Sequence, residues 1–480
     1  RGWGWRHPGR RAWAVRNLDL SVRTGERVLL IGASGSGKST LLMALAGLLD
    51  PSGGGDAEGT LLVDGSPPDR ARGGVGLVFQ DPESQIVLGT AGDDVAFGLE
   101  NRCVPTPEIW PRVDRALDAV AFPYPPGHRT DALSRGEKQR LALAGVVALE
   151  PRVLLLDEPT SNLDPDGAAT FRRTLAALAA GVTTMLLVEH RVDDVLAFVD
   201  RVVVVASASG VVADGTPDEV FGDDARELER LGVWVPSVRE PRSDPIAGAA
   251  PRRSESPLLL ADGVAYRHRG AACDALSPTD VALSGGEALA ILGPNGSGKS
   301  TLALLLGGLL RPSGGTVTAG VAFAPEMRER TPWRWEARHL VRRIGSVFQA
   351  PEHQFVAGRV DQELMVGPRR IGLARADAER RAAQLMDRLE LGDVAAANPH
   401  TLSGGEQRRL SVATALATEP DVLLLDEPTF GLDRHAHGEL SRLLAESRDA
   451  GRAVAFATHD RLLVDAVADR ELMLARRDAP

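Results

Sequence analysis

The sequence is poor in cysteine and has no long hydrophobic run. Its 480 residues include two cysteines, Cys103 and Cys273, which lie far apart and have no cysteine or histidine partner at metal-ligand spacing. A disulfide framework and a zinc site are therefore not indicated, and a reducing, cytosolic setting is consistent with this composition. The longest apolar runs fall well short of the roughly 20 residues that a membrane-spanning helix needs. We therefore expect that the chain does not cross a bilayer itself.

The sequence also lacks an excess of positive charge. Its 65 acidic and 55 basic residues give a formal net charge of -10, which argues against nucleic acid as a partner. Hydrophobic residues make up 43% of the chain and charged residues 25%, as in folded globular domains. A chain of this length has room for two or three domains.

Lysine is also rare in the sequence. Only three of the 55 basic residues are lysines, Lys38, Lys138 and Lys299, and two of them stand in "GxxGxGKST" segments. A compact ammonium group fits beside phosphates where a planar guanidinium would be crowded. We therefore interpret Lys38 and Lys299 as chemically required.

Two copies of one plan follow each other in the chain. "GASGSGKST" at 32–40 returns as "GPNGSGKST" at 293–301, an offset of 261, whereas "VFQDPESQ" at 78–85 returns as "VFQAPEHQ" at 347–354 with an offset of 269. The second copy therefore carries eight additional residues between these motifs. The later motifs keep the offset of 269, so the register of the repeat is firm.

The repeat predicts two domains, at residues 1–235 and 258–480, and a linker at 236–257. The linker sequence is rich in proline, serine and arginine and has no apolar periodicity. Such a composition is typical of a flexible tether.

The pentapeptide "LSGGE" occurs twice, at 283–287 and 402–406, and the repeat shows that the two have different roles. At offset 261 the first falls on "VRTGE" of the first copy, which predicts a tight turn before the strand that leads to the glycine-rich loop. At offset 269 the second falls on "LSRGE" at 133–137. This second pair is therefore the functional motif.

Each glycine-rich segment lies between an apolar strand and an apolar helix, as a phosphate-binding loop does. The glycines let backbone N–H groups surround phosphates, the helix N-terminus adds positive potential, and the lysine reaches the terminal phosphates. Without the strand and helix, a chance glycine-rich turn would be the alternative. The nucleotide-binding residues predicted here are Gly32, Ser34, Gly35, Ser36, Gly37, Lys38, Ser39, Thr40, Gly293, Asn295, Gly296, Ser297, Gly298, Lys299, Ser300 and Thr301. The hydroxyls of Ser39 and Ser300 can ligate Mg²⁺.

Two further apolar runs, "RVLLLDEP" and "DVLLLDEP", end in paired acids. Such runs predict buried parallel strands whose carboxyl ends face a ligand. Asp157 and Asp426 would support Mg²⁺, and Glu158 and Glu427 could accept a proton from water. The alternative is a capping pair at a strand end. Against it, Glu158 stands 78 residues after Gln80, and Glu427 stands 78 residues after Gln349.

The order of the motifs closely resembles that of the ATP-binding cassette (ABC) ATPases. A phosphate loop, a glutamine loop, the "LSGGE"-type signature, "LLLDEP", "SNLD" or "FGLD", and a histidine in "VEHR" or "THDR" occur in this order twice. The resemblance implies an α/β fold of two tandem P-loop NTPase cassettes, each with a RecA-like core, an antiparallel β subdomain and a helical signature subdomain. It implies ATP and Mg²⁺ as cofactors and ATP hydrolysis as the activity.

The resemblance also implies how the residues cooperate. Two cassettes pair head to tail in this family, here within one chain, so that each ATP lies between the phosphate loop of one copy and the signature of the other. His190 and His459 would contact the γ-phosphate, and Gln80 and Gln349 would contact nucleotide and Mg²⁺. The signature residues are Ser134, Gly136, Glu137, Ser403, Gly404, Gly405 and Glu406.

An aromatic residue precedes each phosphate loop, and the first signature differs from the second at one position. Trp5 and Tyr266 are 261 residues apart, in register with the lysines, and the resemblance implies that they stack on adenine, although a lone aromatic can equally be a core residue. The first signature has Arg135 where the second has Gly404. Because a side chain there could hinder or assist phosphate binding, we expect two hydrolysing sites of unequal rate.

The segments that follow the glutamine loops look like those of the ATPases of energy-coupling factor importers. This resemblance implies an ATPase that works on a transmembrane scaffold subunit at the cytoplasmic face of the cell membrane, together with a substrate-capture membrane protein that takes up a vitamin or metal ion. The alternative is a tandem cassette protein that acts on ribosomes. The short, proline-containing linker and the negative net charge favour the importer.

Overall fold

The computed structural model describes residues 1–475 except 11, 162, 180–183, 191, 207–208, 223–224, 237–255 and 271–272. The chain divides into two compact units, Arg1–Glu240 and Pro241–Pro480, and each is considered by itself. Most of the predicted linker lies outside the described residues. The second unit begins with strand β10 at Pro257, one residue before the predicted boundary.

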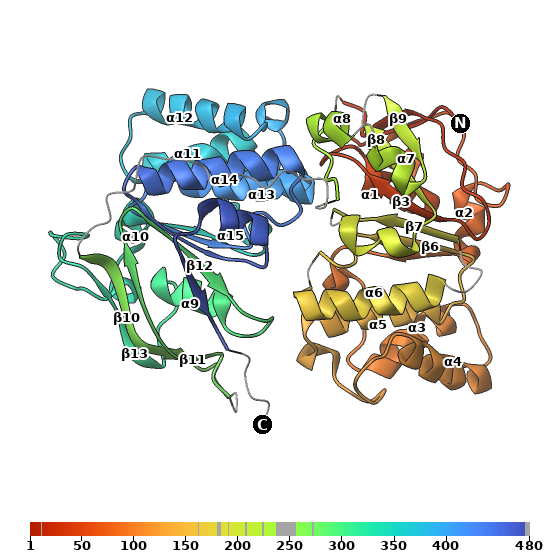
Figure 1. Ribbon diagram of the computed structural model, residues 1–480, viewed down its shortest axis with the longest axis horizontal. Helices are drawn as coiled ribbons and strands as arrows, with labels where there is room; N and C mark the ends of the chain where they lie inside the picture. The colour runs from red at the N-terminus through yellow and green to blue at the C-terminus, as the bar shows by residue number, and fades with distance from the viewer. Residues whose placement is uncertain are drawn as a thin grey trace. The chain divides into compact units, whose positions relative to one another are not determined.

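A predominantly parallel sheet forms the centre of each unit (Figure 1). In the first unit the order is β5 (Val75–Val78), β6 (Val153–Asp157), β7 (Thr184–Val188), β3 (Arg27–Ile31), β8 (Arg201–Ala206) and β9 (Gly210–Gly215), with only β9 antiparallel to its neighbour. In the second unit the order is β14 (Ile344–Val347), β15 (Val422–Asp426), β16 (Ala453–Ala457), β12 (Glu287–Leu292) and β17 (Arg470–Met473), all parallel.

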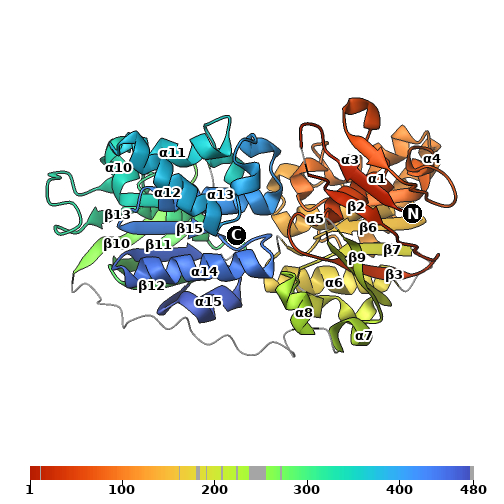
Figure 2. The same cartoon turned by 90° about the horizontal axis from the view of Figure 1, so that it is seen from above.

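Helices cover both faces of these sheets, which explains why the strands are apolar throughout. Along β3, Leu29 and Ile31 pack with α6 (Pro165–Ala179), whereas Val28 and Leu30 pack with α1 (Lys38–Leu45) on the other face. In the second unit β12 alternates in the same way between α14 (Arg434–Asp449) and α9 (Lys299–Leu306). Figure 2 shows α1 and α6 on opposite sides of the first sheet.

A small antiparallel sheet accompanies each core. It consists of β2 (Val15–Leu18), β1 (Trp3–Arg6) and β4 (Asp56–Glu58) in the first unit, and of β11 (Leu276–Ser284), β10 (Pro257–Tyr266) and β13 (Gly314–Ala319) in the second. The first "LSGGE" spans the end of β11, a turn at Gly285–Gly286 and the start of β12. The prediction that this copy of the motif is a turn before a strand is confirmed.

Helical segments complete each unit. The first unit has α3 (Ala91–Asn101), α4 (Thr106–Ala119) and α5 (Arg135–Val147), and the second has α11 (Val360–Arg370), α12 (Arg375–Arg388) and α13 (Gly404–Ala417). The remaining helices are α2 (Pro68–Ala71), α7 (Pro217–Gly222), α8 (Ala225–Arg230), α10 (Ala337–Arg343) and α15 (Arg461–Val467). The predicted α/β architecture of two cassettes with three parts each is confirmed. Among the described residues no helix is long and apolar enough to span a membrane.

Candidate active sites

Both phosphate loops need glycine at the residue that opens the following helix. Gly37 and Gly298 precede α1 and α9 with left-handed φ values of 86° and 98°. A Cβ on Gly37 would lie 2.1 Å from Val15 Cγ2, and one on Gly298 would lie 2.6 Å from the carbonyl oxygen of Ala275. Other residues are therefore excluded by both the backbone angle and the available space.

The two lysines of these loops are buried and point back into the loops. Lys38 Nζ donates hydrogen bonds of 2.9 Å to the carbonyl oxygens of both Gly32 and Ala33. Lys299 Nζ donates to the carbonyl oxygens of Gly293 and Pro294 at 2.7 and 3.1 Å. By contrast, Lys138 forms a surface ion pair with Glu83. The structure thus separates the two loop lysines from the third.

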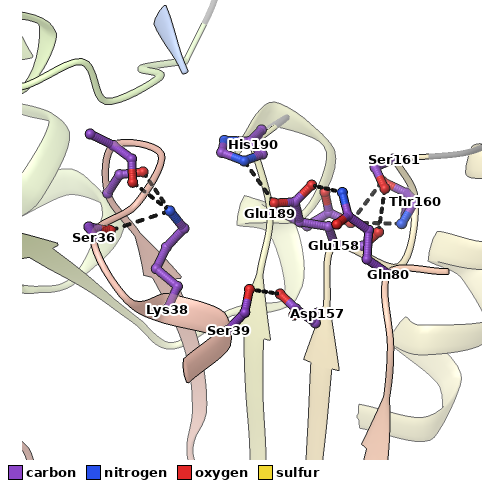
Figure 3. A network of polar contacts seen from close by, with 12 residues as sticks. Ser36, Lys38, Ser39, Gln80, Asp157, Glu158, Thr160, Ser161, Glu189 and His190 are labelled. Carbon is purple, nitrogen blue, oxygen red and sulfur yellow. Dashed lines mark hydrogen bonds and ion pairs between the residues drawn. The ribbon is translucent and has the colours of Figure 1, made fainter. Parts of the chain in front are cut away.

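The first strand-end aspartate lies next to the serine expected to share a metal ion with it. Ser39 Oγ donates to Asp157 Oδ1 at 3.1 Å (Figure 3). Burial and the neighbouring Glu158 carboxylate raise the pKa of Asp157 to about 6. A divalent cation between these two groups would relieve that cost, because it favours the ionised carboxylate.

The glutamates that follow these aspartates have a strained backbone. Glu158 and Glu427 have φ values of 45° and 47°, in the left-handed region that non-glycine residues rarely occupy. In each copy the amide of the glutamate donates at 2.9 Å to the end of the adjacent strand, at Val188 or Ala457. The same strain in both copies at the predicted catalytic residue is typical of functional positions.

Glu158 is held by two predicted site residues. His190 Nε2 lies 2.8 Å from Glu158 Oε1, and Gln80 Nε2 donates to Glu158 Oε2 at 2.8 Å (Figure 3). Burial acts to raise the pKa of Glu158, but the charge and hydrogen bond of His190 together with the charge of Lys38 outweigh it, so the pKa lies below its usual value. The first site therefore brings the predicted catalytic carboxylate together with the motif histidine His190 and the loop glutamine Gln80.

The second site holds its glutamate differently. Glu427 Oε2 accepts from Thr458 Oγ1 at 3.2 Å and from the amide of His459 at 3.4 Å. His459 Nε2 lies 3.9 Å from Glu427 Oε1, but closer to Lys299 Nζ at 3.0 Å and to Asn295 Oδ1 at 3.1 Å. Burial and the charge of Asp426 raise the pKa of Glu427 to about 7.

The signature motifs form the N-termini of two helices. Ser134 caps α5 and Ser403 caps α13, and each forms a reciprocal capping box with a glutamate three residues later. Gly136 and Gly405 lie in the first turns of these helices, and Arg135 is the first residue of α5. Both serines are exposed. The pairing of each signature with the phosphate loop of the other cassette stays a prediction.

The loop glutamines and the aromatic residues differ in part from expectation. The Gln80 side chain donates to Glu158, and its role as a metal ligand, like that of Gln349, stays a prediction. The ring of Trp5 is only 4% exposed, lies over Gly55 and donates to His7. This burial is that of a core residue, the alternative considered above, and stacking of Trp5 on adenine stays a prediction. Tyr266 is half-buried, and stacking there stays a prediction.

The roles of the acids next to His190 and His459, the switch histidines, were not predicted from the sequence. Glu189 accepts from the Thr160 hydroxyl at 2.8 Å. In the second copy Asp460 accepts from Thr429 at 2.7 Å. The only available signal was that these acids flank a motif histidine.

The described residues fit ATP and Mg²⁺. The second phosphate loop contains a buried hydroxyl, Ser297 Oγ, that has no hydrogen-bond partner within the described structure. Together with the left-handed glycines and the buried lysines, it forms a cradle suited to an anion. Serine and aspartate oxygens are the ligand type that Mg²⁺ prefers.

The fold and these sites define a tandem P-loop nucleotide hydrolase. A family model described as ABC transporter matches residues 15–161 and 276–430, one match in each unit. The chain belongs to this family and is an ATPase with two ATP-binding cassettes.

Known proteins resemble the chain over nearly its whole length. The "Putative HMP/thiamine import ATP-binding protein YkoD" of Bacillus subtilis is 32% identical over 485 residues, covering 96% of the chain and 86% of that protein. A "Putative ABC transporter ATP-binding protein" of Methanosarcina acetivorans is 33% identical over 519 residues, covering 98% and 82%. A solved structure named "RNase-L Inhibitor" matches with a TM-score of 0.62 and 20% identity, covering 98% and 87%. At 20% identity, this match shows a shared fold and nothing about the role of the chain.

Proposed function

We propose that the chain is the ATP-hydrolysing subunit of an importer of the energy-coupling factor type, in which it drives a membrane partner to take up a vitamin or metal ion. The single observation that carries this proposal is the 32% identity to a protein named for HMP/thiamine import, over 96% of the chain. The chain would work at the cytoplasmic face of the membrane with a scaffold subunit and a substrate-capture membrane protein.

Each ATP would be bound between the two cassettes. Each unit has a complete phosphate loop with its acids, and a separate capped helix N-terminus that is exposed and has no lysine-bearing loop of its own. A helix N-terminus is a ready anion site. Head-to-tail pairing would place Ser403 against the nucleotide at Lys38, and Ser134 against the nucleotide at Lys299.

The chemistry follows from the residues of each site. Mg²⁺, when bound, neutralises phosphate charge and orients the phosphates for in-line attack. Ser39 and Asp157 would hold it in the first cassette, and Ser300 and Asp426 in the second. Glu158 accepts the proton of the attacking water, and His190 orients that carboxylate through the 2.8 Å contact.

Glu427 and His459 take the same roles in the second site. There, His459 would leave Lys299 when the lysine turns to the terminal phosphates. Closing on ATP and opening after hydrolysis give a two-state switch for transport.

A matched pair of exposed valines supports a docking site for the scaffold. Val87 and Val356 are 61% and 75% exposed, are 269 residues apart, and directly follow the glutamine-loop segments. What distinguishes these valines from other exposed apolar residues is their place beside the glutamine loop in both copies, and this place is the reason for proposing them as the partner surface. A coupling helix of the membrane subunit seated there would contact the segment that carries Gln80 or Gln349.

Recovery of the full-length chain from membranes tests the proposal. We expect it to be recovered with a polytopic membrane protein, and Val87→Glu with Val356→Glu to lower that recovery at least about tenfold, because a charge is placed in an apolar contact. The matched control is Leu48→Glu with Leu309→Glu. These leucines are 53% and 46% exposed and also occupy equivalent positions. Recovery with ribosomal subunits in place of a membrane protein would overturn the importer and favour the alternative function.

A further inference from the structure

A carboxylate holds the segment after the catalytic glutamate in both cassettes. In the first, Glu189 Oε1 accepts from the Thr160 amide at 3.0 Å and from the Thr160 hydroxyl at 2.8 Å (Figure 3). In the second, Asp460 Oδ2 accepts from the hydroxyl of Thr429 at 2.7 Å. Thr160 and Thr429 are equivalent, each two residues after the catalytic glutamate.

The two carboxylates reach the same threonine from opposite sides of the switch histidine. Glu189 directly precedes His190, whereas Asp460 directly follows His459. At the offset of 269, Glu189 corresponds to Thr458 and Asp460 corresponds to Arg191. The bond to the threonine is therefore present in both copies although the acid has changed position.

In the first cassette this arrangement is costly to keep. Glu189 and Thr160 are each 2% exposed, and burial raises the pKa of Glu189 to about 7. A buried acid stabilises a fold less than a well-packed apolar residue would. A role in positioning gives a reason for it that stability does not.

The position of the bond indicates that role. The β6–β7 ends are joined by two cross-links, one from Glu158 to His190 and the other from Thr160 to Glu189. His190 and Glu189 are neighbours in the chain, and Glu158 and Thr160 are two residues apart. If the second bond is lost, the loop that carries His190 is free to move away from the catalytic carboxylate.

We propose that Glu189 is a positioning residue for hydrolysis in the first cassette. It ties the loop of His190 to the segment that follows Glu158, and Asp460 has the same role beside His459 in the second cassette. This inference rests on the assignment of Glu158 and His190 under the proposed function, but it does not depend on what the transporter carries.

Single-turnover hydrolysis by the full chain tests the inference in a Glu427→Gln background, where only the site of Glu158 is left active. We expect Glu189→Leu and Thr160→Val each to lower the rate about tenfold, since each removes a hydrogen bond to a carboxylate. ATP affinity should stay within about twofold. Glu189→Leu removes both bonds to Thr160, whereas Thr160→Val removes only the bond from the hydroxyl. The two substitutions combined should therefore cost about as much as Glu189→Leu alone.

Three further variants separate positioning from loss of structure. Glu189→Gln keeps an acceptor for Thr160 and should retain the rate within about threefold. Glu189→Thr with Arg191→Asp moves the acid to the other side of His190, as in the second copy, and should restore the rate of Glu189→Leu to within about threefold. Thr174→Val removes a buried hydroxyl that bonds within α6, far along the chain from the site, and should have no effect.

Hydrogen exchange gives a second readout that does not depend on hydrolysis. The Thr160 amide should exchange faster in nucleotide-free Glu189→Leu than in the parent chain, because its acceptor is gone. Unchanged exchange, a rate within twofold of the parent, or no rescue by the relocated acid would overturn the inference. If Glu158→Gln in the same background leaves hydrolysis intact, the assignment of Glu158 as the catalytic base is wrong. The inference about Glu189, which rests on that assignment, is then wrong as well.

Discussion

At the scale of single residues, Glu158 and Glu427, the two proposed catalytic glutamates, differ in what surrounds them. His190 lowers the pKa of Glu158, whereas burial and Asp426 raise the pKa of Glu427 to about 7. A general base works only when deprotonated. Hydrolysis that depends on Glu427 should therefore fall as the pH drops through about 7, and hydrolysis that depends on Glu158 should persist to lower pH.

Rate–pH profiles of Glu158→Gln and Glu427→Gln measure this difference, because each variant leaves one site active. ATP affinity at each pH is the control for effects on binding. Profiles that coincide would show that the resting contacts of Glu158 and Glu427 do not persist when nucleotide is bound.

The sequence was sufficient to predict residues whose chemistry is carried by a motif. Lys38 and Glu158 follow from residue type and spacing, and His190 follows from the resemblance to the cassette ATPases. The structure brings Glu158 and His190 together. The role of Glu189 could not be predicted, since at offset 269 it is aligned with a threonine. Only the pairing of β6 with β7 shows that this acid reaches Thr160. The covered face of Trp5 depends on packing against Gly55 in the same way.

At the scale of elements, the strand–loop–helix unit depends on glycine for two separable reasons. Gly37 has a left-handed φ and no room for a Cβ, whereas Gly35 has a left-handed φ of 76° with open space around it. Gly35→Ala should therefore cost about 1–2 kcal/mol of folding free energy from backbone strain alone. Gly37→Ala should cost about 1–3 kcal/mol more, because it also displaces Val15.

Urea denaturation of the nucleotide-free chain compares these two variants. The equivalent glycines Gly296 and Gly298 have the same contrast, with φ values of 77° and 98°, and provide an independent pair. Equal losses at the open and the crowded position would contradict the steric argument.

The alignment of the two copies predicted the end of β11 and the turn before β12, whereas the local motif alone would have misidentified them. "LSGGE" at 283 is identical to the signature in letters, yet it forms the end of β11 and the turn before β12. Only its alignment with "VRTGE" at offset 261 distinguishes it. The first strand described after the predicted linker, β10, begins at Pro257, a residue type that is tolerated at the first position of a strand.

At the scale of the whole molecule, the proposed pairing makes the two ATP sites unequal. Arg135 is the first residue of α5 and occupies the place that Gly404 has in α13. In a head-to-tail pair it would lie against the nucleotide held by Lys299. A side chain there changes how closely the helix N-terminus can approach phosphate, and its cation adds charge. Glu158→Gln and Glu427→Gln should therefore reduce steady-state turnover by different factors.

Arg135→Gly connects that difference to the signature. It removes the one difference between the two motifs. If Arg135 hinders close approach of the backbone to phosphate, the ratio of the turnover losses caused by Glu158→Gln and Glu427→Gln should come closer to one by about threefold or more. Arg135→Lys keeps the positive charge without the planar group and separates charge from shape. Because Arg135 and Lys299 belong to different cassettes, an effect of Arg135→Gly on hydrolysis by Glu427, with none on hydrolysis by Glu158, requires the cassettes to complete each other's sites. The reverse pattern would mean that each signature serves its own phosphate loop.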